Sequence, residues 1–295
     1  MMKAFKLGYA NFSVKNVDAM VQYYTHVMGY AVVERGEDGR VYLSNHIDHH
    51  HIVLTPAQDS ALHSVGLQVK AEDSLDKIAE CLRREGFAAE YKTDAQPGVS
   101  EQIDVVDPSG TTVELYTDMA LSGPGFQRAG ILPSKLGHIT IFAKDKDKTV
   151  GFYTQYLKFA ITDRMEERVT FMTCNQDHHV LNFKVSDRTY MHHIAFELRD
   201  MIHMKNAHDL LTTEKIDIVW GPTRHTAGHN VASYHYDPEH FMIELFCDMD
   251  VFVPELGYFE PRPWHGDQPQ KPKVWTAQEG LSRWETKFFM DLSKG

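Results

Sequence analysis

The stretch LGYANF at residues 7–12 returns as LGHITI at residues 136–141, an offset of 129 from Tyr9 to His138. Further matches follow in the same order at nearly the same offset. They are Tyr23–Thr25 with Phe152–Thr154, His49–Leu54 with Asp177–Asn182 at an offset of 128, and Asp107–Leu115 with Asp237–Leu245 at 130. Ordered matches at an almost constant offset indicate that the chain is a duplicated module.

Each module has the pattern of a strand, a helix and three further strands, repeated. Apolar residues recur at helical spacing from Val17 to Met28, and Gly29 is a candidate C-cap. A second helix is expected from Leu75 to Gly86, with a counterpart near Met201–Leu211. Short β-branched and aromatic segments between turn signals read as strands. The pattern predicts an α+β fold of paired βαβββ units.

The length of the chain and its local composition predict two domains, a linker and a C-terminal arm. A length of 295 residues fits two domains of about 150 each. We expect a metal-free N-terminal domain over 1–120, a linker over 121–134, a catalytic domain over 135–260 and an arm over 261–295. The arm is expected to end in an amphipathic helix that carries Leu281, Trp284, Phe288 and Leu292.

The charge balance excludes several classes of partner. Lys and Arg total 30 against 41 Asp and Glu, a net charge of −11, which disfavours nucleic acid and anionic membranes. No apolar run approaches the ~20 residues that span a bilayer, and the N-terminus lacks the apolar segment of a secretory signal. The cysteines, Cys81, Cys174 and Cys247, form no disulfide framework. We therefore expect a cytoplasmic protein.

Three strands of the second module each carry one side chain that can bind a metal. Successive side chains of a strand point to opposite faces, so the parity of the apolar residues fixes the core face. The core-face residues are Ile139 and Ile141, Ile194 and Phe196, and Ile243 and Leu245. The opposite parity places His138, His193 and Glu244 together on the inner face of a curled sheet.

Two imidazoles and one carboxylate are typical of the facial triad that binds non-haem Fe(II). Such a triad leaves three adjacent coordination positions open for substrate and dioxygen. The equivalent positions in the first module are Tyr9, Ser64 and Glu114, which are poor iron ligands. We therefore expect metal in the second module alone. Mn(II) could occupy the same ligands as Fe(II), and the sequence does not separate the two ions.

A local motif completes the pattern. Residues 223–225 read TRH, and after seven residues the chain continues SYHYDPEH and reaches Glu244. In this arrangement the chain resembles the type I extradiol ring-cleavage dioxygenases of the vicinal oxygen chelate superfamily over roughly residues 5–270. It departs from that family's pattern at Ser233, where an apolar residue is usual, and at His240, where glycine is usual.

The resemblance implies a fold and a set of roles. The fold is the duplicated vicinal oxygen chelate fold, with two curled half-barrel sheets. His138, His193 and Glu244 are the implied metal ligands, and His179 the implied acid/base near dioxygen. Parity alone does not separate His179 from His178. His225 and Tyr234 are the implied pair that binds the substrate hydroxyls.

The implied activity is extradiol cleavage of a catecholic ring by O₂, giving a muconate-type semialdehyde in aromatic catabolism. One alternative is a metal-dependent isomerase or lyase similar to glyoxalase, whose ligands usually come from both modules; Tyr9 and Ser64 argue against it. The other is a non-catalytic protein that binds small molecules on the same fold. By analogy with the family, we expect a homo-oligomer, a tetramer or octamer. The ring substituent of the substrate stays open.

Overall fold

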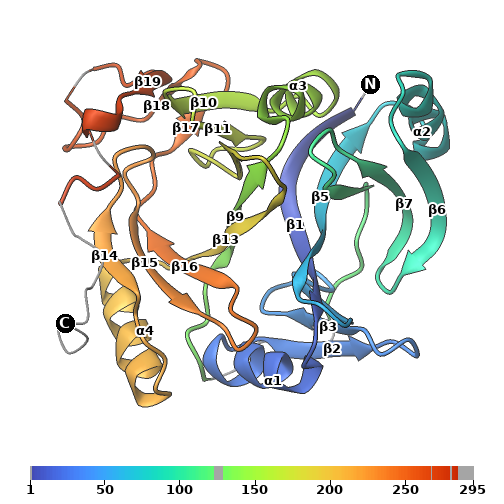
Figure 1. Ribbon diagram of the computed structural model, residues 1–295, viewed down its shortest axis with the longest axis horizontal. Coiled ribbons are helices and arrows are strands. Elements are labelled where there is room, and N and C mark those ends of the chain that lie inside the picture. The colour runs from blue at the N-terminus through green and yellow to red at the C-terminus, as the bar shows by residue number, and fades with distance from the viewer. Residues whose placement is uncertain (1, 123–128, 267, 280, 285–295) are drawn as a thin grey trace.

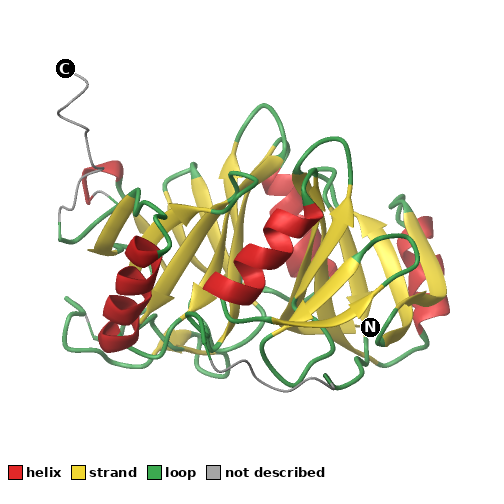
Figure 2. Ribbon diagram, turned by 90° about the horizontal axis from the view of Figure 1, so that it is seen from below, coloured by secondary structure: helices red, strands yellow, loops and turns green. Residues whose placement is uncertain are grey.

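The computed structural model describes residues 2–122, 129–266, 268–279 and 281–284 (Figure 1). Two large β-sheets lie side by side, one built from each half of the chain (Figures 1 and 2). The first has the strand order β2-β3-β4-β1-β5-β8-β7-β6. Its strands are β1 (Met2–Val14), β2 (Ala31–Arg35), β3 (Val41–Ser44), β4 (Ile52–Pro56), β5 (Ala61–Ala71), β6 (Ala89–Gln96), β7 (Val99–Val106) and β8 (Thr112–Tyr116).

The second sheet repeats this topology and adds one edge strand. Its order is β14-β15-β16-β13-β9-β12-β11-β10-β19, so each strand of the first sheet has a counterpart. The strands are β9 (Lys135–Ala143), β10 (Ala160–Met165), β11 (Val169–Thr173), β12 (Leu181–Val185), β13 (Tyr190–Glu197), β14 (Trp220–Arg224), β15 (Val231–Tyr236), β16 (Met242–Cys247) and β19 (Lys273–Trp275). A separate hairpin pairs β17 (Phe252–Val253) with β18 (Tyr258–Phe259).

Helices follow the first and fifth strands of each sheet, as the βαβββ pattern predicts. They are α1 (Val17–Gln22), α2 (Leu75–Arg84), α3 (Lys146–Tyr156) and α4 (Met201–Thr213), with a short 3-10 turn at Ala277–Glu279. Asn16 caps α1 because its side chain accepts a hydrogen bond from the Ala19 amide. The expected first helix is shorter in α form: it passes into a π-helical turn, Tyr23–Val27, before Gly29 takes a φ of +80°.

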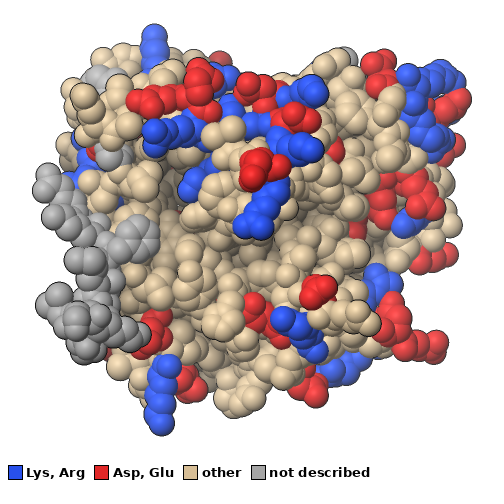
Figure 3. Space-filling model, viewed as in Figure 1, with Lys and Arg blue, Asp and Glu red and all other residues tan. Residues whose placement is uncertain are grey.

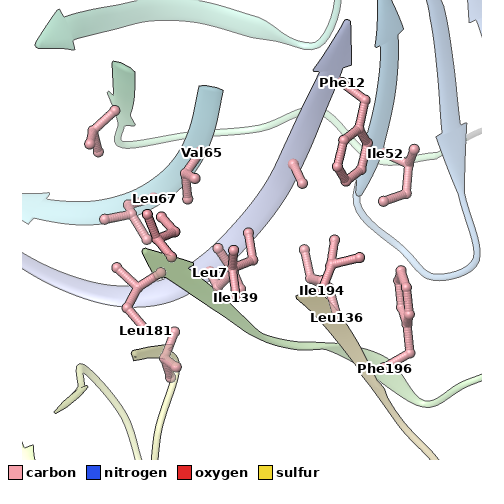
Figure 4. Close-up of a cluster of buried hydrophobic side chains, with 14 of the residues drawn as sticks. Leu7, Phe12, Ile52, Val65, Leu67, Leu136, Ile139, Leu181, Ile194 and Phe196 are labelled. Carbon is pink, nitrogen blue, oxygen red and sulfur yellow. The ribbon is translucent and has the colours of Figure 1, made fainter. Parts of the chain in front are cut away.

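The apolar core lies between the two sheets and is shared by them. Residues of both modules form one continuous buried cluster. Figure 4 shows Leu7 and Leu67 of the first module close to Ile139 and Leu181 of the second. Ile139 is fully buried, as the parity argument predicted. Because this face of each strand is filled by the core, polar residues of the opposite parity point into the concave side of their own sheet.

The structure corrects the alignment of the histidine runs. Ala10 pairs with Ile52 in the first sheet, and Ile139 pairs with Leu181 in the second. Both offsets are 129, so His49 corresponds to His178 rather than to Asp177. The sequence comparison missed this because a run of three histidines can slide by one position without losing its matches.

The arm also differs in part from expectation. Leu281–Trp284 form a bend and a turn instead of a helix, and Phe288 and Leu292 lie outside the described residues. The arm packs on the second module, where β19 runs parallel to β10.

None of the described helices is long and apolar enough to cross a membrane. In Figure 3, positive and negative side chains are interspersed along the upper and right edges of the face, around a broad area without charged groups.

Candidate metal centre and its cavity

The side chains of His138, His193 and Glu244 converge on one point inside the second sheet. The two Nε2 atoms lie 3.2 Å apart, and Glu244 Oε2 lies 3.2 Å from that of His138 and 3.1 Å from that of His193. All three residues are buried. They come from the central strands β9, β13 and β16, in which Ala195 pairs with both His138 and Glu244. Strand pairing therefore brings together residues that are far apart in the sequence.

The spacing of these atoms suits a divalent ion. Ligands about 2.1 Å from a metal, at right angles to one another, lie about 3 Å apart. The three atoms form such a triangle, and they are the donor types that transition metals prefer. Although burial alone would raise it, the nearby His138 and His193 hold the pKa of Glu244 well below its ordinary value. Burial lowers the pKa of His193 to about 4, so this imidazole is neutral at pH 7. The residues present therefore fit a divalent metal.

The corresponding cluster in the first module is closed by hydrogen bonds. Tyr9 donates its hydroxyl to Glu114 Oε2, and Ser64 donates to Glu114 Oε1 at 2.5 Å. Gln96 adds a further donor to Glu114 Oε2 at 3.1 Å. Both carboxylate oxygens are thus already satisfied, and the neighbouring groups are hydroxyls and an amide instead of imidazoles. Tyr9 and Ser64 are thus engaged as donors to Glu114, and a hydroxyl is not a usual transition-metal ligand.

His225 and Tyr234 stand together beside the triad. His225 Nε2 and the Tyr234 hydroxyl share a hydrogen bond of 2.7 Å, and that hydroxyl also donates to Glu244 Oε2 at 2.8 Å. The backbone carbonyl of Leu281, in the arm, lies 3.2 Å from His225 Nδ1 and fixes the other end of the ring. Burial raises the pKa of Tyr234 well above its ordinary value, with Glu244 adding to the effect. Tyr234 is therefore a hydrogen-bond donor across the whole working pH range.

The structure separates His179 from His178. The ring of His179 packs edge-on against His138, 4.3 Å between centroids, and lines the cavity at the triad. His178 points the other way: its Nε2 lies 3.1 Å from Asp163 Oδ2, and its ring stacks on Phe259. Burial lowers the pKa of His179 well below its ordinary value, with the neighbouring His138 adding to the effect.

A cavity of about 170 Å³ opens at the triad. Its wall is mainly aromatic and aliphatic, with a few polar groups that face inward, the usual character of a small-molecule site. An engineered apolar cavity of about 150 Å³ accommodates benzene, so this one has room for a single aromatic ring. Besides the residues already named, its lining includes Phe171, Lys184, His192, Trp220, Met242 and Leu281.

Sequence reasoning missed several residues that support the triad. Asn230 donates to Glu244 Oε1 at 2.9 Å, and the ring of Trp220 stacks on Tyr234. Neither has a parity signal, because Asn230 precedes its strand and Trp220 begins a short edge strand. The unusual Ser233 is explained by α4: its hydroxyl lies 2.8 Å from His208 Nε2, so a polar residue is satisfied where an apolar one is usual.

A second group of metal-type side chains among the described residues is held by ordinary hydrogen bonds. His229 Nδ1 lies 2.7 Å from one oxygen of Asp250, and His265 Nε2 lies 3.0 Å from the other. Each carboxylate oxygen thus has its own imidazole donor. This arrangement ties the arm, through His265, to the loop that follows β16.

Comparisons with known proteins find a matching family and relatives that cover most of the chain. The family model described as "Glyoxalase/Bleomycin resistance protein/Dioxygenase superfamily" matches residues 6–115 and 135–245. The chain is 24% identical to a metapyrocatechase of Pseudomonas sp. (strain CF600), over 92% of this chain and 91% of that protein. It is 27% identical to a 2,2',3-trihydroxybiphenyl dioxygenase of Sphingomonas paucimobilis, over 93% and 97%. The Mn(II)-bound glyoxalase from Novosphingobium aromaticivorans shares the fold, with a TM-score of 0.84, 22% identity, and coverage of 98% and 93%.

Proposed function

Because the chain belongs to the Glyoxalase/Bleomycin resistance protein/Dioxygenase superfamily, we propose that it is an extradiol dioxygenase that opens a catecholic ring with both atoms of O₂. The observation that carries this proposal is the convergence of His138, His193 and Glu244 at the end of a ring-sized cavity. The relatives that match over more than nine-tenths of the chain are named metapyrocatechase and 2,2',3-trihydroxybiphenyl dioxygenase, which supports the same reaction class.

His138, His193 and Glu244 would hold the metal, and we propose Fe(II). A ferrous ion in this position supplies Lewis acidity toward the diol oxygens and electron transfer to dioxygen. The three side chains would hold the ion at the cavity wall, next to the space that a substrate could enter. With two neutral imidazoles and one carboxylate, the occupied site has a net charge near +1, and Lys184 adds a positive group to the cavity wall. Both features favour an anionic diol.

His225 and Tyr234 would orient the diol. Their shared hydrogen bond places a phenolic donor and an imidazole nitrogen side by side at the cavity wall. A substrate hydroxyl can donate to the Tyr234 oxygen, whose own single proton goes to Glu244, while the neighbouring hydroxyl bonds to His225 Nε2. Since Tyr234 is also bonded to Glu244, the position of the diol is tied to that of the metal ligand.

His179 would handle protons. Its ring lies against His138, so it lines the cavity next to one of the proposed metal ligands. Because burial keeps this imidazole neutral, it can accept a proton from the diol and return it later, and such a general acid/base contributes ~10²- to 10⁴-fold in rate.

The cavity favours a single-ring catechol over a two-ring diol. A panel of catechol, alkyl and chloro catechols and a biphenyl diol, mixed with the protein and Fe(II) without oxygen and then exposed to air, tests the proposal. A yellow ring-fission product with single-ring diols is expected. Binding of the diols without a coloured product or O₂ uptake would indicate a sequestering protein and would contradict the proposal.

A further inference from the structure

A chain of three side chains runs from the edge of the second sheet into the cavity. Asp163, on β10, is bonded through Oδ2 to His178 Nε2 at 3.1 Å. His178 Nδ1 and His179 Nδ1 lie 2.9 Å apart, and the two rings are perpendicular. All three residues are at most 3% exposed. The chain therefore connects a buried carboxylate to the imidazole that faces the candidate metal centre.

Donor and acceptor rules give one arrangement of the protons in this chain when both imidazoles are neutral. Asp163 also accepts from the Trp275 indole N–H at 2.5 Å and from the Lys273 amide at 2.9 Å, two groups that can only donate. The carboxylate is thus surrounded by donors, and His178 must donate from Nε2. A neutral His178 then accepts at Nδ1, so His179 donates from its own Nδ1. The nitrogen that remains for the cavity, His179 Nε2, carries a lone pair.

The arm builds the start of this chain. Both Lys273 and Trp275 belong to β19, the strand that the second sheet has in addition to the first. β19 pairs with β10, with Asp163 opposite Lys273. The arm therefore closes the edge at the residue where the chain begins, and it supplies two of the donors that keep Asp163 in place.

The first module contains the same arrangement without these features. Glu34 lies 3.3 Å from His49 Nε2, and His49 Nδ1 lies 3.0 Å from His50 Nδ1. These residues sit 129 positions before Asp163, His178 and His179. However, the Glu34 side chain is 47% exposed, against 1% for Asp163. The ring of His50 contacts Tyr9, which occupies the position that His138 has in the second module. The duplicated arrangement thus provides an internal comparison.

We propose that Asp163 and His178 are positioning residues that hold His179 with its Nε2 lone pair toward the substrate, and that β19 completes this device. The inference rests on the proposed function, in which His179 works at the reacting diol. A metal-bearing cavity needs the orientation of this imidazole to be fixed, because rotation of the ring or a change of tautomer would present a proton in place of a lone pair. The tautomer is a property of the protein alone and does not depend on turnover.

The direct test is long-range ¹H–¹⁵N correlation NMR of the metal-free, ¹⁵N-histidine-labelled protein. Assignment uses the loss of signals in His178→Phe and His179→Gln. We expect His179 to be protonated at Nδ1 and unprotonated at Nε2, and His178 to be protonated at Nε2. A His179 protonated at Nε2 overturns the proposal, whether or not the protein cleaves catechols. Failure of the proposed function is seen separately, as absence of ring-fission product from the iron-loaded wild type.

A kinetic test follows with a matched control. His178→Phe keeps the ring that stacks on Phe259 and removes both nitrogens. We expect kcat to fall at least tenfold, with KM for catechol and bound iron within twofold of wild type. His178→Gln, which can still donate to Asp163 and accept from His179, should recover part of the rate. His49→Phe, the equivalent change in the first module, should leave kcat unchanged.

Two kinetic results would contradict the proposal. An unchanged kcat in His178→Phe contradicts it, as does an equal loss in His49→Phe, which would mark a general effect on folding. If His178→Phe does not fold by circular dichroism, the tautomer of the wild-type protein, together with the kinetics of His178→Gln, still gives the answer.

Discussion

At the scale of single residues, Glu244 and Glu114 make a matched pair. Both are buried glutamates on corresponding strands, one facing two imidazoles and the other facing hydroxyls. Glu244→Ala should therefore remove stoichiometric binding of iron, while Glu114→Ala should keep it. Metal analysis after dialysis against Fe(II) under argon distinguishes the two. Retention of a full equivalent of iron in folded Glu244→Ala would show that the triad is wrong.

Residue-level prediction from sequence succeeded where strand parity applied. His138, His193 and Glu244 each alternate with apolar residues that fill the core, so their common direction was readable. Parity could not choose between His178 and His179, because both follow a bend before β12. Asp163 was not found either: its importance depends on β19, which is more than a hundred residues away and joins the sheet only in the folded chain.

At the scale of elements, the turn before β16 buries the carboxyl group of Asp237 in surroundings that disfavour its ionised form. Asp237 Oδ1 accepts from the amides of Glu239 and Phe241, while its Oδ2 is buried and has no partner among the described residues. Burial raises the pKa of Asp237 from 3.8 to about 7. His240 closes the turn at a φ of +61°, the conformation that glycine adopts at Gly110 of the first module. The departure at His240 therefore leaves the turn intact.

The raised pKa of Asp237 makes stability depend on pH. The folded state keeps a proton that the unfolded state has lost, so between pH 4 and 7 this group lowers the free energy of unfolding as pH rises, by up to about 1.4 kcal/mol per unit. Asp237→Asn, which keeps the acceptor and cannot ionise, removes this slope. In urea unfolding, the free energy of unfolding of the variant, relative to that of the wild type, should be higher at pH 8 than at pH 5. Parallel changes in the two proteins would contradict the assignment.

Helices were predictable where the spacing of apolar residues in the sequence matches the element that forms in the fold. The helices expected near Val17–Met28, Leu75–Gly86 and Met201–Leu211 are present as α1, α2 and α4, and their positions follow from the periodicity of apolar residues. The π-helical turn after α1 was not predictable, because Tyr23 and Tyr24 keep a helical apolar spacing through it. The shape of the arm was missed for the same reason: apolar spacing near Leu281 suggested a helix, whereas contact of its backbone with His225 holds the chain in a bend.

At the scale of the whole molecule, the shared core predicts that the modules unfold together. Leu67 of the first module is fully buried near Ile139 of the second (Figure 4). Leu67→Ala should reduce the free energy of unfolding by about 2–5 kcal/mol. All 4 tryptophans lie at or after Trp220, so their fluorescence reports on the second half. The fluorescence transition in urea should move together with that of circular dichroism. A fluorescence midpoint that stays at the wild-type value would mean independent modules.

The two modules of the duplicated architecture carry different side chains at their corresponding glutamates. Hydrogen bonds from hydroxyl groups occupy Glu114 in the first module, whereas the second module gathers imidazoles around a cavity whose lining includes Leu281 of the arm. The most direct test of ring opening is mass spectrometry of the product formed from catechol and ¹⁸O₂ by the iron-loaded protein. The account predicts an open-chain product that contains two heavy oxygen atoms. A product with none, or unchanged catechol after oxygen is supplied, would contradict it.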